Sequence, residues 1–218
     1  MKPIRDLRVR ANLLRGEARV CGVRLPIENT VISLGLQRLL AEGKFELSEA
    51  RAAKKLIADG ETVLELGSCT GFISSYVRRH TRAGRIICVE ANPQLIPYIE
   101  RVHRLNGVGD AVVLNVVVQP APLQATVPFY CRAEVPTSSL SANGTTPVIS
   151  IVDVATMRLA DVLNTYQPRT LIMDIEGGEL EILNASTIEP VEKLVMEIHP
   201  RIYGKSGTRE AFANVARL

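Results

Sequence analysis

The sequence contains no tryptophan, and all aromatic residues together make up only 4% of its 218 residues. A large stacking platform for a flat aromatic ligand is therefore not expected, and a polar, sugar-like ligand fits the composition better. Long apolar runs are also missing, since runs such as VVLNVVV at 112–118 are far too short to span a bilayer. The basic N-terminus lacks both a continuous apolar core and a small-residue cleavage site, so it does not resemble a signal peptide. We expect a cytoplasmic protein with no membrane partner.

Cysteine is sparse and scattered. The sequence has no CxxC pair and no zinc-ligand spacing among its four cysteines, Cys21, Cys69, Cys88 and Cys131. Reduced thiols, rather than disulfides or a structural metal, are therefore expected.

A strong charge imbalance is absent as well, because the net charge of +3 is too small to indicate a nucleic-acid partner. Basic residues do gather in the first 24 positions, as Lys2, Arg5, Arg8, Arg10, Arg15, Arg19 and Arg24. Such a run could dock an acidic partner or a phosphate-bearing substrate. A solvated basic helix and hairpin is the simpler interpretation, and we favour it.

From residue 61 onward, apolar strands alternate with helices. Strands are expected at 61–66, 85–91, 111–118, 170–175 and 193–199, and helices at 72–82, 93–105, 157–165, 178–185 and 207–218. Apolar strands flanked by helices predict a doubly wound α/β fold whose sheet is mostly parallel.

Two segments depart from this alternation. Residues 16–26 alternate around a central glycine and predict a hairpin, and apolar residues within 30–42 follow helical spacing. We therefore assign residues 1–42 to an N-terminal extension and residues 43–218 to the main domain. Within that domain, the proline-rich segment 119–150 predicts a surface excursion with one or two strands, and 148–154 predicts a further strand.

The stretch VLELGSCTGF at 63–72 places Glu65 near the end of an apolar strand, directly before a flexible turn. Ligands of open α/β sheets bind at the carboxyl ends of strands, and a buried carboxylate needs a partner. Gly67 and Gly71 would let the backbone approach a ligand closely. Their GxxxG spacing differs from the GxGxxG of dinucleotide sites, and Glu65 would attract a cationic ligand. A tight strand-to-helix turn without a ligand is the alternative.

A second carboxylate, Glu90, ends the next strand and is followed by Ala91 and Asn92. This position suits a carboxylate that accepts hydrogen bonds from both hydroxyls of a ribose, whether of NAD or of an adenosyl ligand. Ala91 and Asn92 would then lie close to an adenine. Asn92 is also a good helix N-cap, and capping alone would explain it.

Polar residues also end the last two strands. Asp174 and Glu176 precede two glycines and would point a carboxylate into the same crevice, whereas Glu179 is expected only to stabilise a helix N-terminus. His199 is the only histidine at a predicted strand end and suits a general base, although a structural role explains it almost as well. His80 and His103 fall on helices and are predicted to be surface residues.

With these features placed, the chain resembles class I S-adenosylmethionine-dependent methyltransferases, and more closely their FkbM family. The stretches that carry the resemblance are GKFELSEA (43–50), VLELGSCTGF (63–72), VEANPQL (89–95), RLNGV (104–108), SSL (138–140), VDVATMRLADVL (152–163), LIMDIEGGELEIL (171–183) and VMEIHP (195–200). The pairing of DIEGGE with EIHP is more specific than the glycine motif. The resemblance implies a Rossmann-like fold, S-adenosylmethionine as methyl donor, and a hydroxyl acceptor on a small molecule such as a sugar or natural product.

The resemblance also implies roles for individual residues. The amino-acid end of the donor would be held by the first motif, which comprises Glu65, Gly67, Ser68, Cys69, Thr70, Gly71 and Phe72. Glu90 would hold the ribose, with Ala91 and Asn92 near the adenine. Asp174 and Glu176 would face the methyl-transfer region, and Glu46 would close over the donor. Asp174 and His199 are the candidate general bases.

The chain departs from the family pattern in three places. The first motif has Glu65 and GSCTG where the family often has aspartate and GANxG, and either acid can pair with an ammonium group. Met173 stands where the family often has lysine, which affects acceptor recognition. The sheet is expected to be shortened at its C-terminal end, which would leave an edge strand that a second copy of the chain could cover.

Three alternatives stay open at this point. Asp174, Glu176 and Glu197 could supply oxygen ligands to Mg²⁺, although acidic strand ends without a metal explain the same residues and are preferred. A nicotinamide-dependent oxidoreductase is disfavoured by the GxxxG spacing. A catalytically silent methyltransferase-fold protein that binds a partner would carry the same motifs.

Overall fold

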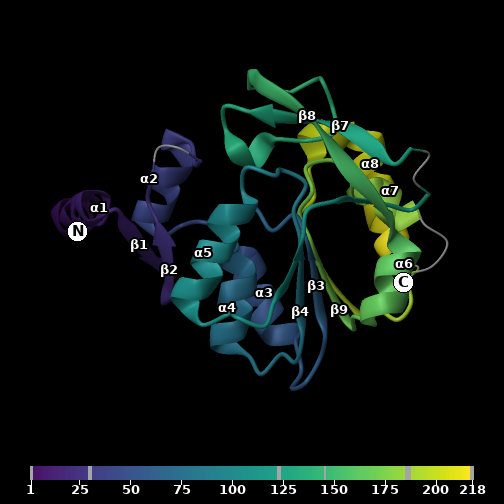
Figure 1. Ribbon diagram of the computed structural model, residues 1–218, viewed down its shortest axis with the longest axis horizontal. Coiled ribbons are helices and arrows are strands. Elements are labelled where there is room, and N and C mark those ends of the chain that lie inside the picture. The colour runs from purple at the N-terminus through teal and green to yellow at the C-terminus, as the bar shows by residue number, and fades with distance from the viewer. Residues whose placement is uncertain (1, 29–30, 122–123, 145, 185–187, 217–218) are drawn as a thin grey trace.

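The fold is built on a five-stranded parallel sheet with the strand order β10-β9-β3-β4-β5. The computed structural model describes residues 2–28, 31–121, 124–144, 146–184 and 188–216 (Figure 1). The sheet strands are β3 (Val63–Leu66), β4 (Ile86–Val89), β5 (Val112–Leu114), β9 (Thr170–Met173) and β10 (Lys193–Met196). The chain builds outward from β3 to β5 and then returns to the other side of β3. The point where strand order reverses therefore lies between β3 and β9.

Helices cover both faces of this sheet, as Figure 1 shows. One face carries α3 (Leu47–Leu56), α4 (Phe72–His80) and α5 (Ile96–Asn106), and the other carries α6 (Leu159–Tyr166), α7 (Glu179–Asn184) and α8 (Pro200–Val215). Alternate strand residues enter the two cores: Ile86 and Cys88 face the first, and Ile87 and Val89 face the second. The predicted doubly wound, Rossmann-like α/β fold is confirmed.

The expected strand 111–118 is wrong in one respect, because it divides into two strands of different sheets. β5 ends at Leu114, and Asn115 then donates its side-chain amide to the carbonyls of Glu90 and Ala91, at 2.8 and 3.0 Å. These bonds hold the chain where it leaves the main sheet. The following strand belongs to a separate three-stranded sheet of order β6-β8-β7, made of β6 (Val117–Gln119), β7 (Thr126–Arg132) and β8 (Val148–Arg158).

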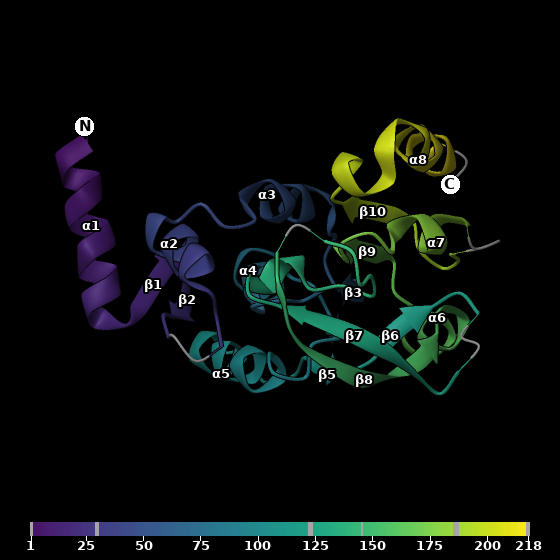
Figure 2. The same ribbon diagram turned by 90° about the horizontal axis from the view of Figure 1, so that it is seen from above.

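The excursion predicted at 119–150 contributes β7 and the start of β8 to this second sheet. β7 and β8 are antiparallel, and β8 is longer than the strand expected at 148–154, so α6 begins at Leu159 rather than at 157. A short 3-10 turn, Val135–Thr137, lies in the connection between β7 and β8. Figure 2 shows the β7–β8 ribbon lying across the carboxyl ends of the parallel strands.

Two helix boundaries also differ from expectation. The helix expected at 93–105 begins at Ile96, because Asn92 caps a turn instead: its side chain accepts from Gln94 N–H at 3.0 Å. Pro97 lies in the first helical turn, where it is tolerated. The last helix begins at Pro200 rather than at 207 and is kinked at Gly204. Residues 217–218, where that helix was expected to end, lie outside the described residues.

The N-terminal extension contains α1 (Lys2–Arg15), the predicted hairpin as β1 (Glu17–Val20) and β2 (Val23–Pro26), and α2 (Leu34–Glu42). The hairpin is attached to α5, since Tyr98 O–H donates to Pro26 O at 2.7 Å and the Asn106 side chain bonds both backbone groups of Arg24. α1 lies beyond the hairpin at one end of the molecule (Figure 2). No helix among the described residues is long and apolar enough to cross a membrane.

Candidate active site

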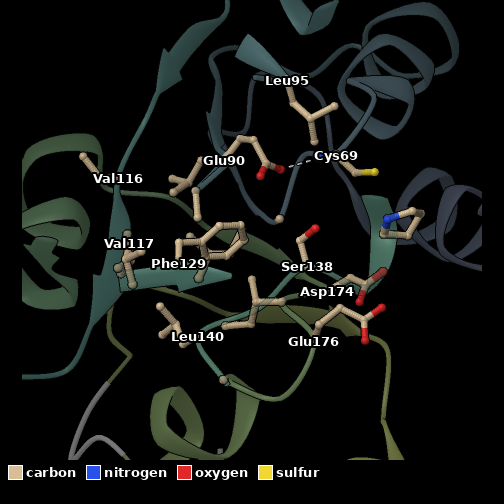
Figure 3. Close-up of a pocket in the computed structure, with 18 of the residues that line it drawn as sticks. Cys69, Glu90, Leu95, Val116, Val117, Phe129, Ser138, Leu140, Asp174 and Glu176 are labelled. Carbon is tan, nitrogen blue, oxygen red and sulfur yellow. Dashed lines mark hydrogen bonds between the residues drawn. The ribbon is translucent and has the colours of Figure 1, made fainter. Parts of the chain in front are cut away.

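A pocket lies over the carboxyl ends of β3, β4 and β9, beside the point where strand order reverses. It contains about 890 Å³ of empty space, part of it open to solvent. The β3 and β4 ends supply Gly67, Cys69, Glu90 and Ala91, the β9 end supplies Asp174 and Glu176, and the second sheet and its loop supply Val117, Phe129, Ser138 and Leu140. In the view of Figure 3, Asp174 and Glu176 lie on one side of the pocket and Val116 and Val117 on the other. Most of the predicted site residues are therefore brought together.

The glycine turn after β3 is fixed by its backbone. The N–H groups of Gly67 and Ser68 both donate to Val89 O, at 2.9 and 3.0 Å, which ties the turn to β4. Gly67 has a φ of +87°, and a Cβ there would stand 1.8 Å from the carbonyl oxygen of Asp174. Only glycine fits, because the turn touches the main chain of the loop after β9.

Glu65 is the buried carboxylate of this turn, with 3% of its surface exposed. Its Oε2 has no hydrogen-bond partner in the described structure, and the same holds for Ser68 Oγ and Thr70 Oγ1. Burial raises the pKa of Glu65 to about 7, although the Cys88 thiol and the Ser74 hydroxyl oppose the rise. Glu65 lines a smaller pocket that shares Glu46, Gly67 and Asp174 with the main one. A cationic group in that space would supply the missing partner.

Glu90 is held differently from Glu65. Its two carboxylate oxygens accept backbone N–H groups from Cys69 at 2.8 Å and Asn92 at 2.7 Å (Figure 3 marks the first). Burial raises its pKa to about 6, and these backbone hydrogen bonds limit the rise. The side chain lines the main pocket in a fixed orientation, and each oxygen retains a lone pair for a further donor.

Five residues predicted to bind a donor line neither pocket: Ser68, Thr70, Gly71, Phe72 and Asn92. The Phe72 side chain is fully buried in the core, where its ring centroid lies 6.1 Å from that of Phe45. Asn92 is buried as the cap of its turn, and Gly71 is the N-cap residue of α4. These positions shape the turns that hold the lining residues and do not line the pocket themselves.

Glu46 reaches the site from the start of α3. It has a left-handed backbone, with φ +44°, and lines both pockets. Burial raises its pKa well above the usual value, and the charges of Asp174 and Glu65 raise it further. Glu46 therefore lies close to the carboxylates of Asp174 and Glu65. The predicted role of closing over a donor requires such a position.

The loop after β9 and the end of β10 bring Asp174, Glu176 and His199 together. His199 Nε2 lies 3.3 Å from Asp174 Oδ1 and 3.7 Å from Glu176 Oε2. Asp174 Oδ1 is nevertheless buried without a hydrogen bond of good geometry. Burial, followed by the charges of Glu197 and Glu176, raises the pKa of Asp174 to about 8. A carboxyl that titrates near neutrality over a pocket is suited to proton transfer.

Glu179 contributes more to this loop than the sequence predicted. Its carboxylate is fully buried and accepts the N–H groups of Ile175 and Gly177, both at 2.9 Å, as well as the Tyr203 hydroxyl. His199 Nδ1 lies 3.5 Å away. Glu179 therefore joins the loop that carries Asp174 to α8, in addition to stabilising a helix N-terminus.

The same loop brings together a set of candidate metal ligands. Donor atoms of Asp174, Glu197 and His199 lie within 4.8 Å of one another, so His199 stands where Glu176 was expected in the ligand set. Glu197 is exposed, and Mg²⁺ prefers oxygen ligands to nitrogen. The set is a weak match to Mg²⁺.

The prediction that His103 is a surface residue is wrong. The side chain is buried at 4% exposure, and its Nε2 lies 2.9 Å from Ser74 Oγ. Burial lowers its pKa to about 4, which keeps the ring neutral. His103 lies on α5, which packs against α4 near Gly71. A Cβ at Gly71 would stand 3.3 Å from the His103 ring. His80 is partly exposed and contacts Cys21 O at 2.7 Å.

Comparison with known families agrees with this geometry. The family model described as "Methyltransferase FkbM domain" matches residues 65–217, which contain Glu65, Glu90, Asp174 and His199. The chain belongs to the FkbM methyltransferase family. The family match thus spans both the glycine turn and the acidic loop after β9.

Several solved structures are similar to this FkbM-family chain at low sequence identity. Precorrin-6y C5,15-methyltransferase from Geobacter metallireducens GS-15 has 13% identity and a TM-score of 0.47, covering 78% of this chain and 69% of that chain. An O-methyltransferase from Bacillus cereus in complex with SAH has 11% identity and a TM-score of 0.47, covering 79% and 70%. TYW2 from M. jannaschii, in complex with AdoMet, has 14% identity and a TM-score of 0.35, covering 48% and 46%. Among curated proteins, no match was found.

Proposed function

We propose that this protein transfers a methyl group from S-adenosylmethionine to a hydroxyl group of a small molecule. The observation that carries the proposal is the pair of buried carboxylates, Glu65 and Glu90, on either side of the glycine turn. A ligand with an ammonium group at one end and a ribose at the other would pair with both. Such a donor supplies an activated methyl group on a sulfonium, so the protein mainly has to align the acceptor and exclude water.

Asp174 is the proposed general base for the acceptor hydroxyl. It lines the main pocket, whereas His199 does not line that pocket and lies 3.3 Å from Asp174 Oδ1 through its Nε2. We therefore assign proton acceptance to Asp174 and assign orientation of its carboxylate to His199. Glu179 holds the loop on which Asp174 stands.

The donor site is tested by isothermal titration with S-adenosylhomocysteine. We expect micromolar binding by the parent protein, and binding weakened about tenfold or more in Glu65→Gln and Glu90→Ala, since each loses a charged hydrogen bond. Glu100→Gln is the matched control, because Glu100 is an exposed glutamate of α5 outside the pocket lining. It should bind like the parent.

The same titration separates the alternative functions. Binding of NADH in place of S-adenosylhomocysteine would favour an oxidoreductase. A well-folded parent that binds neither ligand would contradict the proposal and favour a catalytically silent protein. Activity that disappears with a chelator and returns with Mg²⁺ would show that the acidic loop uses a metal.

A further inference from the structure

The connection between β7 and β8 forms one wall of the main pocket. We define its residues 133–141 as the wall loop, and four of them line the pocket: Val135, Pro136, Ser138 and Leu140. In the view of Figure 3, Ser138 lies between Glu90 and Asp174. The longest regular element within the wall loop is the 3-10 turn at Val135–Thr137. The position of the loop therefore depends on contacts with other parts of the chain.

The second half of the wall loop is held by the end of β7. Arg132 is buried, and its guanidinium donates to three carbonyls, at 2.6, 2.8 and 3.1 Å: those of Thr146, Ser141 and Ala142. Its backbone N–H donates to Ser138 Oγ at 3.0 Å. All of these bonds lie at or beyond residue 138, so the first half of the loop needs a different support.

That support comes from the N-terminal extension. The Ser33 hydroxyl donates to Glu134 Oε2 at 2.5 Å, and the two residues are 101 positions apart in the sequence. Ser33 is the N-cap residue of α2, and its Oγ also accepts the backbone N–H of Leu36 at 3.2 Å. Because the N-terminus of a helix carries a partial positive charge, the carboxylate of Glu134 is stabilised at this position.

Gly35 leaves the space that this contact occupies. A Cβ at Gly35 would stand 2.8 Å from Glu134 Oε2, which is too close for two atoms that are not bonded. Gly35 lies in the first turn of α2 and does not have a positive φ, so its backbone does not require glycine. Glycine is also less favourable than alanine inside a helix. Room for the Glu134 carboxylate therefore accounts for glycine at this position.

The start of α2 is itself fixed relative to the main sheet. Leu36 and Leu40 are buried in the same hydrophobic core as Phe72 of α4. Gln37 is also buried, and its side-chain amide donates to Ile32 O at 3.0 Å, which holds the turn before the helix. A contact with this end of α2 can therefore hold a loop in place.

We infer that Glu134 is a positioning residue: through its contact with Ser33 at the start of α2, it holds the wall loop over the donor pocket. The N-terminal extension would then be part of the active site, although the family match begins only at residue 65. This inference rests on the proposed function, which places the donor in the same pocket at Glu65 and Glu90.

The test moves the Glu134 carboxylate without removing a core residue. Gly35→Ala places a methyl group against that carboxylate, and the flexible Glu134 side chain can move away at small cost to the fold. Glu134→Ala removes the carboxylate, whereas Glu134→Gln keeps an acceptor oxygen for Ser33. Gly109→Ala is the matched control, because Gly109 does not have a positive φ and no atom of the described residues lies within 4 Å of its Cβ position.

Two measurements are made on the full chain. Hydrogen–deuterium exchange of the free protein should become faster within residues 133–141 in Gly35→Ala and Glu134→Ala, with the rest of the chain and the urea midpoint unchanged. Isothermal titration with S-adenosylhomocysteine should give a Kd about three- to tenfold higher in both variants, because the wall loop is in place for a smaller fraction of the time. Glu134→Gln should fall between Glu134→Ala and the parent, and Gly109→Ala should equal the parent.

Failure of this inference can be distinguished from failure of the proposed function. If the parent does not bind S-adenosylhomocysteine, the proposed function fails, and the exchange of the free protein still decides whether Glu134 holds the wall loop. If the parent binds, an unchanged Kd in both Gly35→Ala and Glu134→Ala would overturn the inference. Unchanged exchange within residues 133–141 would overturn it as well. So would faster exchange spread evenly over the chain, since that would be a general loss of stability.

Discussion

Two strands that end at the pocket, β4 and β9, hold their carboxylates in opposite ways. At the end of β4, Glu90 is fixed by two backbone N–H groups and has a defined orientation before any ligand arrives. At the end of β9, Asp174 lies beside Glu176 and His199. Its Oδ1 is 3.3 Å from His199 Nε2 and has no hydrogen bond. The first arrangement favours binding, since orientation is settled in advance, and the second favours proton transfer, since the charged form is destabilised.

This comparison predicts that Asp174→Asn should have the largest effect, and that it should act on turnover. Loss of a general base lowers kcat by about 10²–10⁴-fold, whereas the donor contacts at β3 and β4 are untouched. Turnover is measured with the best acceptor from a panel of hydroxylated small molecules, and affinity by titration with S-adenosylhomocysteine. Activity equal to that of the parent would remove Asp174 from the mechanism.

The pH profile sharpens this prediction. A base must be deprotonated to act, so kcat should rise as pH increases through about 8, the pKa of Asp174, and level off above it. The rise should be missing in Asp174→Asn. If the variant keeps the same profile, another group is the base.

Glu90→Ala should have the next largest effect, and it should act on binding. The variant loses the proposed ribose contact and leaves the N–H groups of Cys69 and Asn92 without their acceptor. We expect the Kd for S-adenosylhomocysteine to rise about 10- to 100-fold. Glu90→Gln keeps one acceptor oxygen and should fall between the parent and Glu90→Ala. A larger change in kcat than in Kd would contradict the division of roles.

Glu179→Gln tests whether the loop after β9 depends on its anchor. Glutamine cannot accept all three donors of Glu179, so we expect the free energy of unfolding to fall by about 1–3 kcal/mol. Urea unfolding measures this, and Tyr203→Phe is the matched variant that removes one donor and leaves the carboxylate. Since Glu179 acts through the loop, kcat should fall less than in Asp174→Asn. Unchanged stability would show that the loop does not need the anchor.

The smallest effect concerns stability and pH. Folding raises the pKa values of Asp174, Glu65 and Glu90 to about 8, 7 and 6, so the folded protein holds protons that the unfolded chain releases. Their contribution to stability is complete below about pH 4 and is lost as pH rises towards 8. Asp174→Asn removes one of these groups, so its Tm should exceed that of the parent by a few degrees at pH 8, and the difference should shrink at pH 5. A difference independent of pH would contradict the raised pKa.

The sequence predicted what local patterns determine. Apolar runs that end in acids and glycines placed Glu65, Glu90 and Asp174 at one edge of the sheet, because the carboxyl ends of parallel strands share an edge. It did not predict that the run 111–118 divides at Asn115, since that depends on bonds to Glu90 and Ala91 more than 20 residues away. The proline at position 200 was an available signal for the start of α8, because proline is favoured in the first helical turn.

The site residues missed or misjudged share one cause, which is contact between segments distant in sequence. Glu179 was expected to stabilise only its own helix, and its bond to Tyr203 crosses 24 residues. His103 was predicted to be a surface residue because it falls on a helix, although its ring contacts Gly71 and Ser74 of another helix. Helical spacing predicts which residues share one face of a helix, but it does not predict which other element packs against that face.

The contact between Gly67 and Asp174 has a consequence for how this enzyme can change. Asp174 N–H donates to Leu66 O at 3.0 Å, and the missing side chain of Gly67 leaves room for the Asp174 carbonyl. The distance between the glycine turn and Asp174, the proposed base, is therefore set by the main chain. Exchange of pocket-lining side chains such as Phe129 and Leu140 would therefore change the shape of the pocket without changing the distance between the glycine turn and the proposed base.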